Sequence, residues 1–185
     1  MKLWISGLLA ISAFAAAIAP GASRAANLAT LYSFCSLANC ADSAYPSGLL
    51  IFDANGSLFG TTEGDGGDLD CSLMGPGCGT VFEIAKTPGT TTGYANSPII
   101  LYSFCAQANC TDGKAPLGGV IADASGNLFG TTLAGGSFSI ICGGYVGCGT
   151  AFEIAKTPGT PTGYANVPIP WSASTAPMAR CPSPA

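Results

Sequence analysis

The side chains best suited to chemistry in this 185-residue chain are its nine cysteines, eight of which fall into four close pairs. Disulfides between near neighbours are the chemistry expected of cysteines in an oxidising compartment. A metal cluster is the alternative, but zinc sites prefer spacings of about two to four residues and often use histidine, which this chain lacks. We predict four local disulfides, with Cys181 left as a free thiol or a link to another chain. The pairs are Cys35/Cys40, Cys71/Cys78, Cys105/Cys110 and Cys142/Cys148.

Carboxylates form the second group of candidates. Glu63, Asp65, Asp68 and Asp70 place four carboxylates in eight residues. A solvated loop is the favoured interpretation, and a calcium site is the alternative, because calcium takes oxygen ligands. No other metal or cofactor is expected. Glu83 and Glu153 would make an acid/base pair of the kind used in glycoside hydrolysis. Because the pair arises by duplication of one position, a structural role is favoured, and we predict no catalytic residues.

A tandem repeat explains that duplication. Residues 78–96 and 148–166 agree at 17 of 19 positions with an offset of 70, and LYSFC occurs at both 31–35 and 101–105. Short apolar or alternating runs separated by Gly- and Asn-rich turns predict strands. They lie at 48–53, 58–62, 80–85 and 98–104, and again at 119–123, 128–132 and 150–155, with a further N-terminal strand at 28–34.

Four consecutive antiparallel strands recurring as a module are typical of a propeller blade. The expected fold is therefore all-β, with two tandem four-stranded antiparallel propeller-like blades. Since a propeller closes with about four to eight blades, two make an incomplete or an oligomeric β-propeller. A truncated relic, a ring of copies and a free-standing disulfide-stapled domain all remain open.

The repeat also resembles the bacterial GloVer tandem-repeat family, whose motif includes G-N-L-Y-G-T-T and G-T-V-F. The matching residues are Gly48–Leu50, Asp53, Gly56, Leu58–Thr62, Gly79–Ile84 and Leu101–Phe104, with positions 118–132 and 149–154 in the second copy. Phe59 and Phe129 replace the family's tyrosine, and Ala151 replaces its valine. The resemblance implies an extracellular, propeller-like protein and transfers no catalytic residue.

The expected organisation begins with a signal peptide at 1–25, where Lys2 precedes an uncharged apolar run and a small-residue cleavage site. An N-terminal strand and cysteine loop (26–47), repeat 1 (48–117), repeat 2 (118–172) and a disordered tail (173–185) follow. The cleaved chain carries four cationic and ten acidic side chains. Too few cations remain to neutralise phosphates, so nucleic acid is not an expected partner, and no later segment is apolar enough to span a membrane.

These patterns predict a secreted, extracellular or periplasmic repeat protein that acts as a non-catalytic binding or structural module. Its expected partners are copies of itself, in a ring or strand-swapped oligomer, or an extracellular glycan or protein. The alternatives are a carbohydrate-active enzyme that uses the loop carboxylates, and a degenerate gene fragment without activity.

Overall fold

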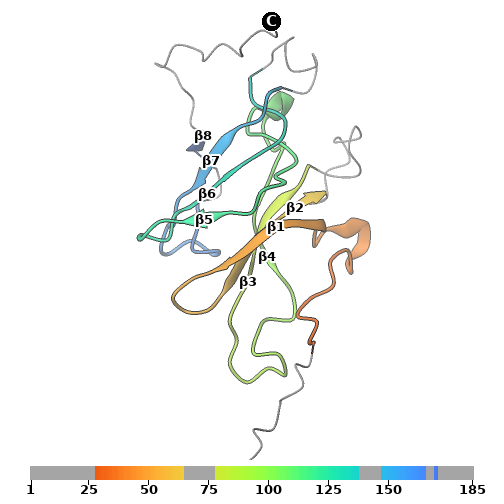
Figure 1. Ribbon diagram of the computed structural model, residues 1–185, viewed down its shortest axis with the longest axis vertical. Helices are drawn as coiled ribbons and strands as arrows, with labels where there is room; N and C mark the ends of the chain where they lie inside the picture. Colours follow the sequence, from red (N-terminus) through yellow and green to blue (C-terminus); the bar gives the residue numbers. More distant parts are fainter. Residues whose placement is uncertain (1–27, 65–77, 138–146, 166–168, 171–185) are drawn as a thin grey trace, which may run out of the picture.

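The structure, a computed structural model, describes residues 28–64, 78–137, 147–165 and 169–170, and these residues form two antiparallel sheets (Figure 1). In each sheet the strands follow one another in chain order. Helix in the described residues is limited to two single 3-10 turns, Ala38–Cys40 and Ala108–Cys110. The first sheet contains β1 (Ala44–Phe52), β2 (Leu58–Gly64), β3 (Thr80–Ile84) and β4 (Ile99–Ser103). The second contains β5 (Ile121–Ala122), β6 (Leu128–Thr131), β7 (Ala151–Ile154) and β8 (Ile169–Pro170).

The all-β fold and its two antiparallel sheets are thus confirmed. Seven of the predicted strands fall where expected, within a few residues at their ends. No sheet closes on itself among the described residues, and the assignment of the sheets to a β-propeller stays a prediction. β1 begins at Ala44, four residues before the boundary predicted for the first repeat. The predicted signal peptide and C-terminal tail lie outside the described residues.

The predicted strand at 28–34 is not present, since no ladder forms in those residues. Its repeat equivalent, β4, is a strand because it pairs with β3, with Val81 opposite Tyr102. No strand among the described residues takes the place of β3 beside residues 28–34. A strand needs a partner for its backbone N–H and C=O groups, so the same LYSF sequence is a strand at one position and not at the other.

A glycine in the middle of each sheet is required by an aromatic ring on the neighbouring strand. Gly60 lies opposite Phe82, and Gly130 lies opposite Phe152. A Cβ at Gly60 would lie 2.7 Å from the Phe82 ring, and one at Gly130 would lie 2.5 Å from the Phe152 ring. Any larger side chain would displace these rings, so the glycine of the FGTT motif is a packing requirement.

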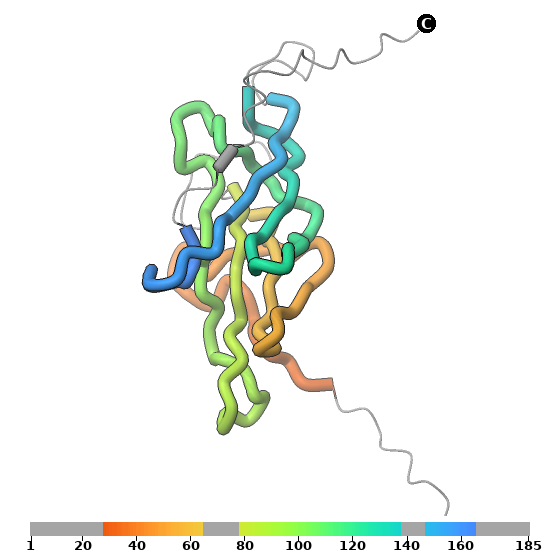
Figure 2. Tube along the Cα trace, turned by 90° about the vertical axis from the view of Figure 1, so that its left-hand side faces the viewer, coloured from red at the N-terminus to blue at the C-terminus, as the bar shows by residue number. Residues whose placement is uncertain are grey.

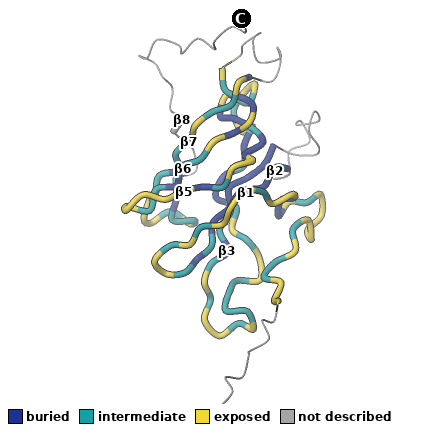
Figure 3. Tube along the Cα trace, viewed as in Figure 1, coloured by how far each residue is buried: buried dark blue, intermediate teal, exposed yellow. Residues whose placement is uncertain are grey.

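The hydrophobic core lies between the two sheets (Figures 2 and 3). Phe59 of the first sheet meets Tyr164 at a ring-centroid distance of 5.8 Å, and Phe104 meets Phe152 at 5.0 Å. Val81 is fully buried in the same cluster. Each sheet therefore turns one face toward the other, and the first sheet has a second face that points away from its partner.

Candidate functional site

The two units of the repeat differ in how much of one face is covered. Leu50 is 53% exposed, whereas its repeat equivalent, Val120, is 2% exposed. Tyr45 is 62% exposed, whereas its equivalent, Ala115, is 5% exposed. The first sheet covers this face in the second unit. In the first unit the Phe34 ring packs on Phe82, and no described residue covers Tyr45 and Leu50. We call this surface the open face and define it by Phe34, Tyr45, Pro46, Leu49 and Leu50.

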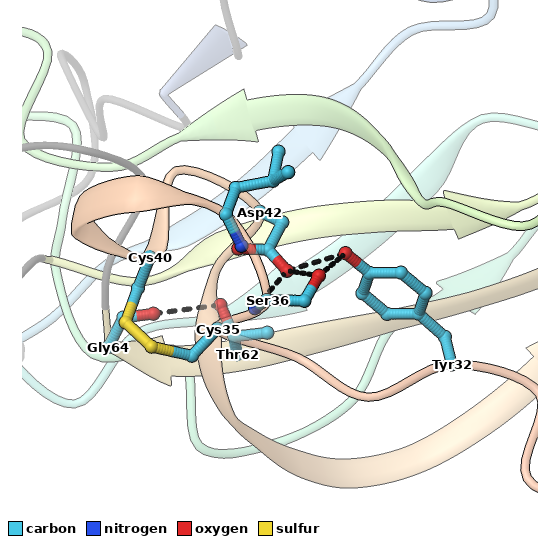
Figure 4. Close-up of a disulfide and its surroundings, with 8 residues drawn as sticks. Tyr32, Cys35, Ser36, Cys40, Asp42, Thr62 and Gly64 are labelled. Atoms are coloured by element: carbon cyan, nitrogen blue, oxygen red, sulfur yellow. Dashed lines mark hydrogen bonds between the residues drawn. A yellow bond between two sulfur atoms is a disulfide. The ribbon is translucent and has the colours of Figure 1, made fainter.

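A pocket of about 430 Å³ lies at one end of the open face. The Cys35–Cys40 disulfide (Figure 4) forms one side of it, and the start of β1 forms the other. Its lining is mostly apolar and aromatic, which is typical of surfaces that bind another molecule. The lining residues are Tyr32, Phe34, Cys35, Cys40, Ala44, Tyr45 and Pro46.

A buried carboxylate fixes the loop that shapes the pocket. Asp42 accepts hydrogen bonds from the Tyr32 hydroxyl and from the backbone N–H groups of Ser36 (2.8 Å) and Leu37 (3.1 Å). Burial by itself raises the pKa of Asp42, but these hydrogen bonds outweigh it and hold the pKa well below its usual range. Asp42 is therefore a structural anchor, and its lone pairs are committed to the loop.

A cluster of hydroxyl groups joins this loop to the sheet. The Thr80 hydroxyl is 2.8 Å from the hydroxyls of both Ser43 and Thr62, and all three residues are buried. Thr132 and Thr150 form the equivalent pair at 2.9 Å. Because each hydroxyl has a partner inside the protein, these threonines serve the packing of the sheet.

In the second unit the place of the pocket is filled by the chain itself. Gly79 accepts a hydrogen bond from the backbone N–H of Phe104 (3.0 Å), and Cys78 accepts one from the N–H of Ala115 (2.9 Å). The Cys78 sulfur lies within 4.8 Å of the sulfurs of Cys105 and Cys110. Those two sulfurs are bonded to each other, so the three form a packed sulfur cluster and not a set of metal ligands.

No family model, curated protein or solved structure matches the chain. The resemblance to the GloVer family therefore stays a prediction from sequence. Within the described part of the chain, no helix has the length and apolar character that crossing a bilayer requires.

The disulfide predictions are confirmed for two pairs, Cys35–Cys40 and Cys105–Cys110. Cys78 and Cys148 are disulfide-bonded as well, and their predicted partners, Cys71 and Cys142, lie outside the described residues, as does Cys181. The two described bridges occupy repeat-equivalent positions beside the two copies of the cysteine loop.

The acidic loop is described only at its first carboxylate. Glu63 is half-buried near the end of β2, and Asp65, Asp68 and Asp70 lie outside the described residues. The solvated loop favoured from the sequence and its alternative, a calcium site, both stay hypotheses.

Glu83 and Glu153 occupy the same register position in different sheets, opposite Phe59 and Phe129. Burial raises the pKa of Glu83, and a hydrogen bond with Ser57 opposes the rise. Each copy of this ladder position thus carries one glutamate, and the structural role expected from the duplication stays a prediction.

Two tyrosines at repeat-equivalent positions pack beside the long connections. Tyr164 is 3% exposed against Phe59, and Tyr94 holds the Lys86 ammonium 4.2 Å from its ring centroid. Sequence reasoning missed the open face, although a signal was present: where the first unit has Tyr45, Leu49 and Leu50, the second has the smaller Ala115, Gly119 and Val120.

Proposed function

We propose that this chain is a secreted, non-catalytic repeat protein that acts as a binding or structural module through its open face. The observation that carries the proposal is the difference in exposure between repeat-equivalent positions, 53% at Leu50 against 2% at Val120. A surface that one copy of the module buries is presented to solvent by the other.

The chemistry of the open face supports binding in preference to catalysis. The pocket lining is apolar or aromatic apart from backbone groups and the Tyr32 and Tyr45 hydroxyls. Asp42, the carboxylate bonded to the lining residue Tyr32, is 3% exposed and saturated by donors of its own loop. A group held in this way is a poor general base, because its pKa is depressed and its lone pairs are occupied.

Turnover and retention on glycans separate the proposal from its enzymatic alternative. The purified protein is incubated with cellulose, chitin, starch and peptidoglycan while reducing ends and bound protein are measured. We expect no release of sugar from any of the four. Release that disappears in Glu63→Gln or Glu83→Gln would refute a non-catalytic role and favour the carbohydrate-active enzyme.

The surface itself is tested by Leu50→Glu, with Ile121→Glu as the control. Ile121 is 69% exposed but lies on β5 of the second sheet. Any binding by the protein, to a glycan or to a protein, is expected to fall in Leu50→Glu and to persist in Ile121→Glu. Equal loss in both variants, or loss in the control alone, contradicts a role for the open face.

A further inference from the structure

We propose that the open face binds a second copy of this chain, head to tail, by completion of a β-sheet. Residues Leu31–Phe34 of one copy pair with the edge of β7 in the next, and the Cys148–Gly149 segment of that copy enters the pocket. This inference rests on the proposed function, because it names the partner of the same surface.

The junction between the two units inside one chain supplies the geometry. Ser103 pairs with Thr80 and Tyr102 pairs with Val81, after which the chain crosses to the second unit. Beyond this ladder, the Phe104 N–H bonds to the carbonyl of Gly79. The LYSFC sequence at 101–105 therefore acts as a connector between the two sheets. Its first residues belong to the last strand of the first sheet, and Phe104 packs on Phe152 of the second.

The same connector sequence occurs at 31–35, where it has no sheet to complete among the described residues. The C-terminal part of this segment contacts the first unit, because the Phe34 ring packs 4.9 Å from Phe82 and the Tyr32 hydroxyl bonds to Asp42. The residues before this segment are open to solvent, with Leu28 97% exposed. The donor half of a junction is thus already held in place on the first unit.

The second sheet supplies the acceptor half. β8 pairs only with Phe152 and Glu153, so in the described part of the chain Ala151 has no strand opposite it on that edge. Val81, the equivalent of Ala151, is completely buried, whereas Ala151 is exposed. Cys148 is likewise exposed where Cys78 is buried. After β8 the sequence reads WSAST in place of the connector LYSFC.

Applying the offset of 70 residues to the internal junction fixes the register of the proposed contact. Ser33 of one copy lies opposite Thr150 of the next, and Tyr32 lies opposite Ala151. The carbonyl of Gly149 accepts a hydrogen bond from the Phe34 N–H, and the carbonyl of Cys148 accepts one from the Tyr45 N–H. Both N–H groups belong to residues that line the pocket.

One part of the proposed contact packs less closely than the equivalent part of the junction inside the chain. A Cβ at Gly119 would lie 2.3 Å from the carbonyl oxygen of Leu49, so the internal junction requires glycine there, and the first unit carries Leu49 at the equivalent position. Tyr45 likewise replaces the smaller Ala115. These bulkier side chains hold the two copies apart in this part, which leaves the strand and the pocket as the centre of the contact and weakens association.

A cross-link tests the register. In the internal junction Thr80 lies opposite Ser103, and the hydrogen bond beside this pair runs from the Phe104 N–H to the Gly79 carbonyl. Thr80 and Ser103 are therefore a non-hydrogen-bonded pair, the kind in which opposite side chains lie closest. Ser33→Cys with Thr150→Cys, in a Cys181→Ser background, is expected to form intermolecular disulfides under mild oxidation. The control is Ser33→Cys with Thr131→Cys, which places an exposed thiol on β6. Covalent multimers in the first variant only support the proposal; multimers in both or in neither overturn it.

Association of the full chain is measured by light scattering over a concentration series. The edge variant is Ala151→Pro. The Thr150 carbonyl faces β6, because it accepts the Thr132 N–H. Backbone groups of successive strand residues point to opposite sides, so the Ala151 N–H points toward the open edge, where proline is tolerated. We expect association to weaken at least about tenfold in Ala151→Pro, to persist in Ala151→Ser, and to strengthen in Leu49→Gly with Tyr45→Ala.

Failure of this inference is distinguishable from failure of the proposed function. A chain that stays monomeric at every concentration, but binds a glycan or protein in a manner sensitive to Leu50→Glu, refutes the second copy and leaves the binding module standing. Release of sugar in the turnover assay refutes the module whatever the oligomeric state. Association that Ala151→Pro leaves unchanged refutes strand completion.

Discussion

Truncation of Val120 is expected to destabilise the fold more than truncation of Leu50, although leucine is the larger side chain. Val120→Ala removes two methyl groups from a fully covered position, a loss of about 1.6 kcal/mol in transfer free energy, and the cavity left between the sheets brings it to about 2 kcal/mol. Leu50→Ala removes about 2.4 kcal/mol of apolar transfer, but the side chain is 53% exposed, so roughly 1 kcal/mol is lost.

The assay is reversible urea unfolding of the dilute, monomeric protein, with the dependence on urea compared among the variants. The two substitutions occupy repeat-equivalent positions, so each serves as the control for the other. A loss in Leu50→Ala that equals or exceeds the loss in Val120→Ala would refute the reasoning, because it would mean that the open face is covered in the monomer.

Two further predictions concern the polar scaffold. Because the pKa of Asp42 is lower in the folded protein than in the unfolded chain, the stabilisation that Asp42 provides is present above about pH 4 and is lost as the pH falls below that value. In thermal unfolding between pH 7 and 2, the loss of stability toward acid is expected to be smaller in Asp42→Asn. Thr80→Val leaves the hydroxyls of Ser43 and Thr62 without their shared partner and is expected to cost about 1–3 kcal/mol in urea unfolding. The half-buried equivalent, Thr150→Val, is expected to cost less. A loss of stability toward acid that Asp42→Asn leaves unchanged would contradict the role of Asp42, and a larger cost for Thr150→Val than for Thr80→Val would contradict the role of Thr80.

The strands were predictable because their information is local. Thr80–Ile84 alternates in the sequence, and the turn before β2 carries Asp53, whose carboxylate accepts the N–H groups of Asn55 (2.9 Å) and Ser57 (2.9 Å). The prediction failed at 28–34 because a strand also depends on a partner, and partners are set by tertiary structure. Val81 and Phe82 alternate along β3 and are both buried, because the core between the sheets covers one side of the strand and Phe34 packs on the other.

The site was less accessible to sequence reasoning than the fold. The pairing of Cys35 with Cys40 was predictable from their spacing and from the repeat. That the loop they close would shape a pocket depends on Asp42, whose burial and donors are evident only in three dimensions. The differences at Tyr45 and Leu50 between otherwise similar repeats were visible in the sequence, but their meaning depends on knowing which face the first sheet covers.

Amide hydrogen exchange measured by NMR at low and high protein concentration tests the central claim most directly, namely that equivalent modules present a surface covered in one and open in the other. In dilute protein the N–H groups of Phe104 and Ala115, bonded to Gly79 and Cys78, are expected to exchange slowly, and those of Phe34 and Tyr45 rapidly. At high concentration the second pair is expected to become protected while the first is unchanged. Equal protection of both pairs in dilute protein, or rapid exchange of Phe104 and Ala115, would contradict the account.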